Sequence, residues 1–372
     1  MRADGLRNWA GVGLLALLGV APLRAQELPP IPGRPTALTP GAAADRKLPT
    51  DLDLTPAPVP ADAPTIHSTD CHTAPAEGAE RGWASGLFFD ADYLLIKPRR
   101  NALDFAIVAP NRDQIPSGAV ESLEWQLRSA FRFAAGYEFA NGWRVGAHYT
   151  YLHSTDSATV NAPDGGTVYA TLTRGGTFDE VATATATTNL NYNVLDIEAS
   201  KFTALSDTLG LTVFGGARAA WIDQKFVAVY NGGPLGATNA TVDTPVNFSG
   251  GGLTFGAEAT WKIYRGLGLY GRARGSLLSG RFNDSLTETN NNNQNVIVNV
   301  GERYYQLVPV MELGAGVSFQ TEHVYVGLGY DVVNWFNMVN SLDFPSTNIG
   351  KPERRTSNLT LEGFSVRLGV IF

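Results

Sequence analysis

Two short runs of residues carry side chains that could do chemistry, and the first is His153-Ser154-Thr155-Asp156. A histidine, a hydroxyl and a carboxylate together are the groups used in nucleophilic hydrolysis. Neighbouring side chains on an extended strand point to opposite faces, however, so adjacency in the sequence does not assemble a triad. The simpler interpretation is the start of a loop rich in turn-forming residues. We expect no catalytic residues, and hydrolysis is the weakest of the activities considered.

The second run surrounds Cys71, the only cysteine of the chain, which has His72 beside it and His67 nearby. A single cysteine excludes a disulfide framework within the chain. A structural metal site needs more ligands at fixed spacing than this proline-rich stretch supplies. We therefore expect an inert thiol, no metal ligands and no cofactor. The sequence also contains no phosphate-binding loop and no nucleophile elbow.

A larger set of ionisable residues occurs at alternate positions within apolar stretches. The set is Glu124, Arg128, Arg132, Glu138, Arg144, His148, Glu258, Arg272, Arg274 and Arg367. Such residues could set the electric field inside a water-filled passage. They could equally pair with one another and fill a closed interior. Which of these two arrangements applies depends on the secondary-structure elements that position the residues.

Those elements are predicted to be long β-strands. Between Leu123 and Phe139 the odd positions are mostly apolar or aromatic and the even positions charged or small, a period of two. Similar alternation follows Trp143, Leu209, Leu253, Leu267, Tyr305 and Val324, and ends the chain from Phe364 to Phe372. Two less regular strands are expected near residues 87–97 and 189–202. Ordinary strands have about 5–6 residues, whereas tilted membrane strands need about 9–11.

The connections between these strands alternate in length. Two three-residue hairpin loops end in glycine, Ala140-Asn141-Gly142 and Tyr264-Arg265-Gly266. Residues 205–208 and 320–323 make further tight links, and every second connection is long. Short turns on one side and long loops on the other are typical of transmembrane barrels. The count gives ten strands, or twelve if a hairpin near Asp104–Val108 is added.

Composition agrees with a barrel and excludes other classes. Charged residues make up 17% of the chain, against roughly 25% in soluble domains. Beyond the first 25 residues, no apolar run approaches the length that a transmembrane helix needs. The formal net charge is -7 and there is no basic block, so nucleic acid is not an expected partner.

The N-terminal part differs from the rest. Residues 1–25 resemble a secretory signal peptide, with Arg2 and Arg7 before a short apolar core and a cleavage site after Ala25. Residues 26–82 are rich in proline and lack aromatic residues, so they cannot form a packed core. We predict a disordered periplasmic segment there, followed by an outer-membrane β-barrel over 83–372.

The apolar strand faces are predicted to contact lipid. Aromatic residues cluster near strand ends, as in the girdles at bilayer interfaces: Trp143, Trp221, Trp261, Tyr264, Trp335 and Phe336. Unpaired strand edges cannot face hydrocarbon, so the sheet must close. The predicted fold is therefore all-β, a transmembrane antiparallel up-and-down barrel with the charged rows inside.

Three stretches resemble one known family. FFDADYLLIKPRRNALDFAIV (88–108), GAVESLEWQLRSAFRFAAGYEFANGWRVGAHYTYLHS (118–154) and NYNVLDIEASKF (191–202) are similar to the Legionella-type major outer membrane proteins. The resemblance extends from about Gly86 to Phe372, and it implies a pore-forming barrel. The terminal aromatic Phe372 is similar to the signal that barrel-assembly machinery recognises in outer-membrane proteins.

The leading functional hypothesis is a pore for ions or small hydrophilic solutes, with outer-membrane lipid and the assembly machinery as partners. About eight strands are just filled by side chains and wide channels need about sixteen, so ten or twelve favour a small or gated pore. The alternative is a structural or adhesive barrel with a filled lumen. The N-terminal segment and the C-terminus are expected in the periplasm, and the sequence leaves the oligomeric state open.

Overall fold

The computed structural model of the chain describes residues 85–112, 116–174, 180–233, 237–321, 323–345 and 352–372. The signal peptide, the proline-rich segment and Cys71 lie outside these residues. Within the described part of the chain, no helix is long and apolar enough to cross a membrane.

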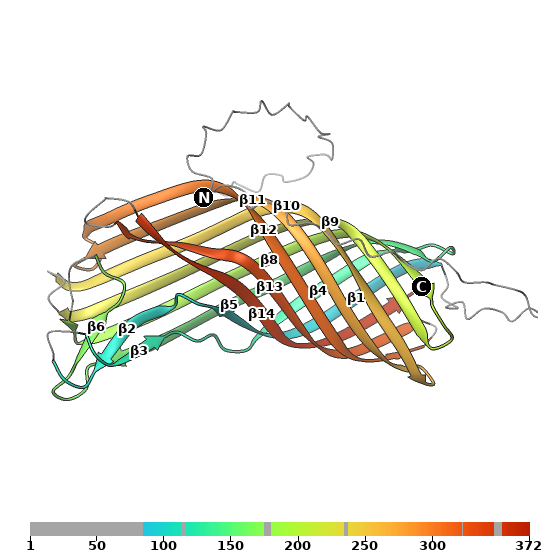
Figure 1. Cartoon of the computed structure of the whole chain (residues 1–372), viewed down its shortest axis with the longest axis horizontal. Helices are drawn as coiled ribbons and strands as arrows, with labels where there is room; N and C mark the ends of the chain where they lie inside the picture. Colours follow the sequence, from blue (N-terminus) through green and yellow to red (C-terminus); the bar gives the residue numbers. More distant parts are fainter. Residues whose placement is uncertain (1–84, 113–115, 175–179, 234–236, 322, 346–351) are drawn as a thin grey trace, which may run out of the picture. The chain divides into compact units, whose positions relative to one another are not determined.

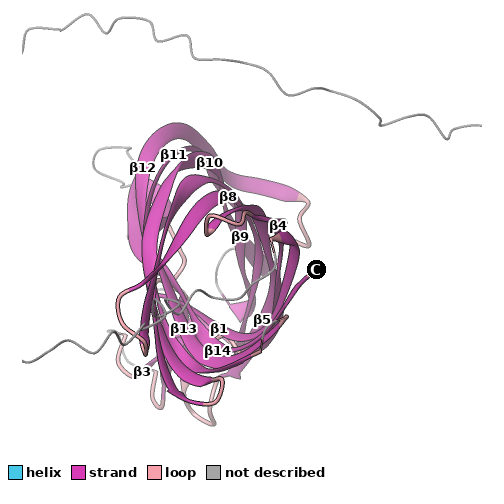
Figure 2. Cartoon of the chain, turned by 90° about the vertical axis from the view of Figure 1, so that its right-hand side faces the viewer, coloured by secondary structure: helices cyan, strands magenta, loops and turns pink. Residues whose placement is uncertain are grey.

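Ten antiparallel strands close into one barrel, as predicted (Figure 1, Figure 2). In chain order they are β1 (Gly86–Arg100), β4 (Arg128–Glu138), β5 (Trp143–Asn161), β8 (Thr183–Ala204), β9 (Leu209–Gly233), β10 (Ala237–Tyr264), β11 (Leu267–Asn290), β12 (Asn295–Gln320), β13 (Val324–Pro345) and β14 (Pro352–Ile371). The first and last strands close the ring, with a register from Phe88↔Ile371 to Arg100↔Leu359.

The short turns and the C-terminus lie at one end of the barrel, here called the short-turn end. Gly142, in the turn between β4 and β5, has a left-handed φ of 77°. Between β10 and β11 the turn has two residues rather than the predicted three, because Tyr264 pairs directly with Leu267. Its central residues, Arg265 and Gly266, both have positive φ.

At the opposite, long-loop end, three of the five predicted long loops are mostly strand. The β9–β10 ladder continues to Gly233↔Ala237 and the β11–β12 ladder to Asn290↔Asn295, and β13 and β14 also remain paired to Pro345↔Pro352. Threonine, valine and asparagine keep the period of two in the β9–β10 and β11–β12 extensions. The strands therefore extend as hairpins where the sequence suggested loops.

Two long connections remain, between β1 and β4 and between β5 and β8. They contain β2 (Asp104–Ala109), β3 (Ala119–Ser122), β6 (Thr167–Ala170) and β7 (Glu180–Val181). These four form a separate small sheet in the order β3-β2-β6-β7, here called the mouth sheet. The predicted strand near Asp104 therefore exists, but it does not join the barrel, and the twelve-stranded alternative is wrong.

Over most of their length, the barrel strands alternate between buried inward and exposed outward side chains, as β11 and β12 illustrate. On β11, for example, Tyr270 and Leu278 are buried, whereas Leu269 and Leu277 are exposed. A soluble sandwich would bury its apolar face instead. Closure pairs the backbone groups that would otherwise face hydrocarbon, so the exposed apolar wall suits lipid.

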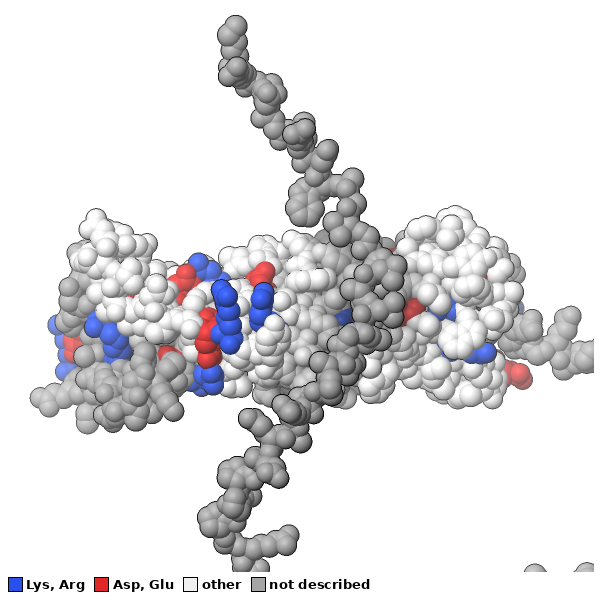
Figure 3. Space-filling model, turned by 90° about the horizontal axis from the view of Figure 1, so that it is seen from above, with Lys and Arg blue, Asp and Glu red and all other residues white. Residues whose placement is uncertain are grey.

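The exposed apolar wall has the height of a bilayer. On β12 it runs from Phe319 up to Leu307, and the exposed Arg303 lies above it. At ~3.3 Å per residue and a tilt of about 40°, this stretch spans roughly 30 Å along the barrel axis. On the face seen in Figure 3, charged side chains gather mainly toward the long-loop end.

Candidate functional site

The lumen next to the short-turn end is charged and contains a cavity of about 190 Å³. Its lining includes Gly142, in the turn between β4 and β5, and Gln320, the last residue of β12, together with Glu198 and Arg274 farther along their strands. The acidic and basic residues around it are Asp90, Asp92, Arg132, Glu138, Arg144, His148, Glu198, Glu258, Arg272, Arg274 and Arg367. Both signs of charge therefore face the same space.

Strand register places these charges opposite one another. The inward pairs of directly opposed, oppositely charged residues include Asp92↔Arg132, Asp92↔Arg367, Glu138↔Arg144, Asp196↔Arg218, Glu258↔Arg272 and Arg274↔Glu312. Opposite charges at facing positions stabilise an antiparallel pair. The alternation that turns the apolar residues outward also brings these charges together inside.

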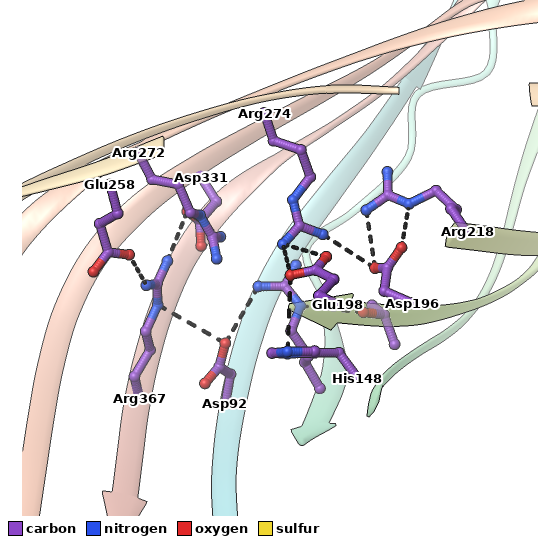
Figure 4. A network of polar contacts seen from close by, with 12 residues as sticks. Asp92, His148, Asp196, Glu198, Arg218, Glu258, Arg272, Arg274, Asp331 and Arg367 are labelled. Atoms are coloured by element: carbon purple, nitrogen blue, oxygen red, sulfur yellow. Dashed lines mark hydrogen bonds and ion pairs between the residues drawn. The ribbon is translucent and has the colours of Figure 1, made fainter. Parts of the chain in front are cut away.

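Arg218 on β9 is the centre of the most buried part of the network (Figure 4). Its Nε and Nη2 donate to both oxygens of Asp196, at 2.6 and 3.0 Å, and it also pairs with Glu312. Arg274 donates to the same Asp196 at 3.1 Å and to Glu198 at 3.0 Å. Each charge in this part of the network, namely Asp196, Glu198, Arg218, Arg274 and Glu312, thus has at least one partner of opposite sign.

Arg367 on β14 joins a second group of carboxylates (Figure 4). Its guanidinium lies 3.3 Å from Asp331 and 3.4 Å from Glu258. Asp92, on the neighbouring β1, lies 3.8 Å from it and accepts a bond from Arg132 at 3.2 Å. Near the short-turn end, Arg144 and Asp90 pair at 2.6 Å. The network therefore spans the lumen and links strands far apart in the sequence.

Nine of the ten residues expected inside the barrel occupy inner-face positions. Eight line the cavity: Arg132, Glu138, Arg144, His148, Glu258, Arg272, Arg274 and Arg367. The ninth, Arg128, sits higher on the inner face of β4 and bonds Asp156 at 2.6 Å.

Glu124 does not face the lumen, and that prediction is wrong. Strand β4 begins only at Arg128, so the alternation starting at Leu123 is not one continuous strand. Leu123 and Trp125 are buried, and Glu124 is 79% exposed beside Lys97 on the outer side of β1. The chain changes direction before β4 enters the barrel wall. As a result, the odd-numbered Leu123 and Trp125 are buried, whereas the odd-numbered residues of β4 face outward.

The aromatic residues expected at the bilayer interfaces divide into two groups. Trp143, Trp221, Trp261 and Tyr264 are exposed on the outer wall, and Phe336 occupies an outward, half-buried position on β13. Trp335 is completely buried inside the barrel, so its assignment to the girdle is wrong. Its ring meets the rings of Tyr192 and Phe248 at centroid distances of 5.8 and 6.4 Å.

Sequence reasoning missed about half of the charge network. The residues not identified are Asp90, Asp92, Asp196, Glu198, Arg218, Glu312 and Asp331. Their odd or even position within an alternating strand could have shown that they face the lumen. Arg218, for example, lies between Ala217 and Ala219 of an alternating outward row, which places it inside.

Above the charges, the lumen is filled by an apolar layer. Phe248, Phe282, Tyr192 and Trp335 are buried there in one continuous cluster. The mouth sheet adds Phe105 and other apolar residues to this cluster from the long-loop end. The charged cavity is therefore closed on that side by side chains.

Polar contacts hold the mouth sheet to the barrel. The hydroxyl of Tyr230 donates to the carbonyl of Phe105 at 2.8 Å and accepts the N–H of Leu172 at 3.3 Å. Arg355 on β14 bonds Asp104 at 3.1 Å and Asp343 at 2.8 Å. These contacts connect β2, β9, β13 and β14 at the mouth.

The run that begins at His153 does not form a catalytic arrangement. His153 is exposed on the outer face and contacts Asn191 at 2.6 Å, whereas Asp156 faces inward and binds Arg128. Within the described residues, no group of three or more His, Cys, Asp or Glu side chains could hold a metal ion.

Comparison with known proteins identifies one family. The family model described as "Legionella pneumophila major outer membrane protein precursor" matches residues 79–372. No curated protein matches the sequence.

Several solved structures are similar in arrangement. The outer membrane protease OmpT from Escherichia coli shares 13% identity, with 77% of this chain and 97% of that chain covered and a TM-score of 0.43. A TodX deltaS2S3 mutant monoaromatic hydrocarbon channel shares 9% identity, with coverage of 78% and 92% and a TM-score of 0.33. Neisserial surface protein A shares 14% identity, with coverage of 77% and 98% and a TM-score of 0.26.

Proposed function

Because the chain belongs to the family of the Legionella pneumophila major outer membrane protein, its barrel lies in the outer membrane of a diderm bacterium, and we propose that it is a narrow, gated pore. The solutes would be ions or small hydrophilic molecules. The observation that carries the proposal is the cavity of about 190 Å³ at the short-turn end, lined by charges of both signs.

The balance of charge supports weak rather than strong selectivity. Among the described residues, the network contains six arginines and seven carboxylates in ion pairs: Arg132, Arg144, Arg218, Arg272, Arg274 and Arg367, with Asp90, Asp92, Asp196, Glu198, Glu258, Glu312 and Asp331. A nearly neutral lining attracts no single sign of ion over a long range.

We further propose that the short-turn end faces the periplasm and the mouth sheet faces the exterior, as short turns and longer loops do in barrels of this kind. The outward aromatic residues would then mark the two interfaces of the membrane, and the charged cavity would open toward the periplasm.

A structural barrel without transport is the second candidate. It is favoured by the apolar layer around Trp335 and by the completeness of the ion pairing. The two candidates differ in whether the layer can open.

Conductance measurement distinguishes them. Purified barrel in a planar bilayer is expected to give small, discrete current steps. An Arg144→Gln variant, which removes one positive charge from the cavity and leaves Asp90 without its partner, should shift the reversal potential in a salt gradient toward cation preference. Arg99→Gln is the matched control, because Arg99 pairs with Glu362 on the outer wall. Lasting silence of correctly folded wild-type protein would favour the structural candidate.

Phe372 is proposed to act in assembly. Its ring is 73% exposed and meets the ring of Phe89 at 6.2 Å, so the folded barrel loses little packing without it. We expect Phe372→Ser to reduce the amount of barrel in the outer membrane while leaving export across the inner membrane intact. Phe364→Ser, a change on the same outward face, is the control. Equal membrane levels for both variants, measured by fractionation, would contradict a special role of the terminal residue.

A further inference from the structure

Strand β13 leaves the barrel wall partway along its length. It pairs with β12 only from Tyr325↔Gln320 to Trp335↔Val310. On its other side, the register with β14 changes between Trp335↔Leu359 and Val339↔Ser357. Asn337, inside this irregularity, has a left-handed φ of 53°, and its N–H donates to Asn358 at 3.0 Å. Asparagine tolerates this conformation better than most residues, so the bend is built into the sequence.

Beyond the bend, the strand lies inside the barrel. Met338–Phe344, here called the inturned segment, is buried at consecutive positions from Met338 to Leu342 and again at Phe344. A wall strand would alternate between buried and exposed residues. Strand β13 contacts β10 and β11, which are not its neighbours in the ring. The apolar residues Met338, Val339, Leu342 and Phe344 of the inturned segment belong to the buried cluster that contains the apolar layer, so the segment fills part of the lumen.

Polar contacts join the inturned segment to β9, β12 and β14. It stays paired with β14 from Val339↔Ser357 to Leu342↔Arg354, and Asp343 accepts a bond from Arg355 at 2.8 Å. Gln224 on β9, four strands away in the ring, donates to the carbonyl of Met338 at 3.4 Å. Asn340 donates to the hydroxyl of Tyr304 at 2.9 Å and accepts a bond from Thr356 at 3.4 Å. The contacts with β9 and β12 are individual hydrogen bonds, which contribute little net stability, so the segment can change position together with its β14 partner.

The bend leaves the neighbouring strand with a free edge. In the described part of the chain, β12 above Val310 pairs with β11 but with no strand on the side of β13. Tyr305 and Leu307 on this stretch are among the most exposed apolar residues of the wall. Continuing the register of Trp335↔Val310 would set Met338 opposite Leu307 and Asn340 opposite Tyr305. An unpaired strand edge is a template for another strand.

We propose that the inturned segment is the gate of the pore: it closes the lumen in its present position and opens it by moving to the free edge of β12. This inference rests on the proposed pore function. Its energetic basis is an exchange of partners. The segment gives up contacts inside the lumen and gains backbone pairing and cover for Tyr305 and Leu307 in the wall.

A cross-link tests the closed position. In a Cys71→Ser background, Gln224→Cys/Met338→Cys joined by a short bis-methanethiosulfonate reagent, which attaches through a disulfide bond to each cysteine, ties the inturned segment to β9. We expect the current steps to disappear on linking and to return on reduction. Thr254→Cys/Ser276→Cys is the matched control, because these residues face each other in the β10–β11 ladder and their hydroxyl oxygens lie 2.9 Å apart.

Variants that remove contacts of the inturned segment test whether weakening its closed position opens the pore. Asn340→Ala removes the contacts with Tyr304 and Thr356, and we expect an increase of about tenfold in the ratio of open to closed time. Gln224→Ala should act in the same direction, since it releases Met338. Heat-dependent electrophoretic mobility establishes that each variant is a folded barrel.

The outcomes separate the gate from the pore. Loss of current on linking, together with longer opening of Asn340→Ala, supports the gate. Unchanged currents after linking in a wild-type barrel that conducts would overturn the gate and leave the pore function standing. Silence of wild type, Asn340→Ala and Gln224→Ala alike would overturn the pore function and, with it, the gate.

Discussion

An Arg218→Ala variant is expected to lose about 3–5 kcal/mol of unfolding free energy, the usual effect of removing one partner from a buried ion pair. Arg218 is 3% exposed and neutralises Asp196 and Glu312 together. Without it, two carboxylates remain in the lumen with Arg274 as their main nearby cation. The loss should appear in urea titrations of the barrel in lipid vesicles, followed by tryptophan fluorescence.

The matched control is Arg354→Ala. Arg354 also forms a two-bond contact with a carboxylate, Glu302, at 2.5 and 2.8 Å, but its side chain is 49% exposed. Exposed pairs contribute about 0–1 kcal/mol. Arg218→Lys, which keeps the charge but not the paired donors to Asp196, should fall between the two. Similar losses for Arg218→Ala and Arg354→Ala would show that burial of the network does not contribute as argued.

Much of the barrel could be predicted because membrane strands are long and alternate strictly. The row from Phe364 to Phe372 needs no tertiary information, since each outward residue contacts lipid and not a particular partner. The inward position of Arg132 or Arg367 follows from the same parity. Ring closure is then required by unpaired peptide groups in hydrocarbon.

The partners of each charge could not be predicted, because they depend on register between strands. Asp92 meets Arg132 and Arg367 because β1 lies between β4 and β14, and only ring closure brings β14 there. The prediction that Glu124 faces the lumen was wrong for a different reason. Its alternation continues that of β4, but the chain enters the wall at Arg128, and hydrophobic patterning alone does not mark that point.

The bend in β13 also could not be predicted from the pattern of residue types. Asn337 carries no turn signal as strong as glycine, and the residues after it continue to resemble a strand. Their burial results from a change of direction and not from a change of composition. Alternation along β13 could have placed Trp335 inside, because Tyr330 faces outward and the two residues are an odd number of positions apart. A tryptophan near a strand end is, however, also typical of an interface girdle.

Trp335→Ala is expected to cost about 3–5 kcal/mol of unfolding free energy, the range found when a large buried aromatic ring is truncated. The ring is completely buried and lies against Tyr192 on β8 and Phe248 on β10, so its loss leaves a cavity bounded by three strands. Trp261→Ala is the control, because that ring is 55% exposed on the outer wall, where lipid fills the space. Urea titrations of both variants should give a clearly larger loss for Trp335. Equal losses would mean that Trp335 does not support the closed layer, which would leave the charge network and the mouth sheet to close the lumen.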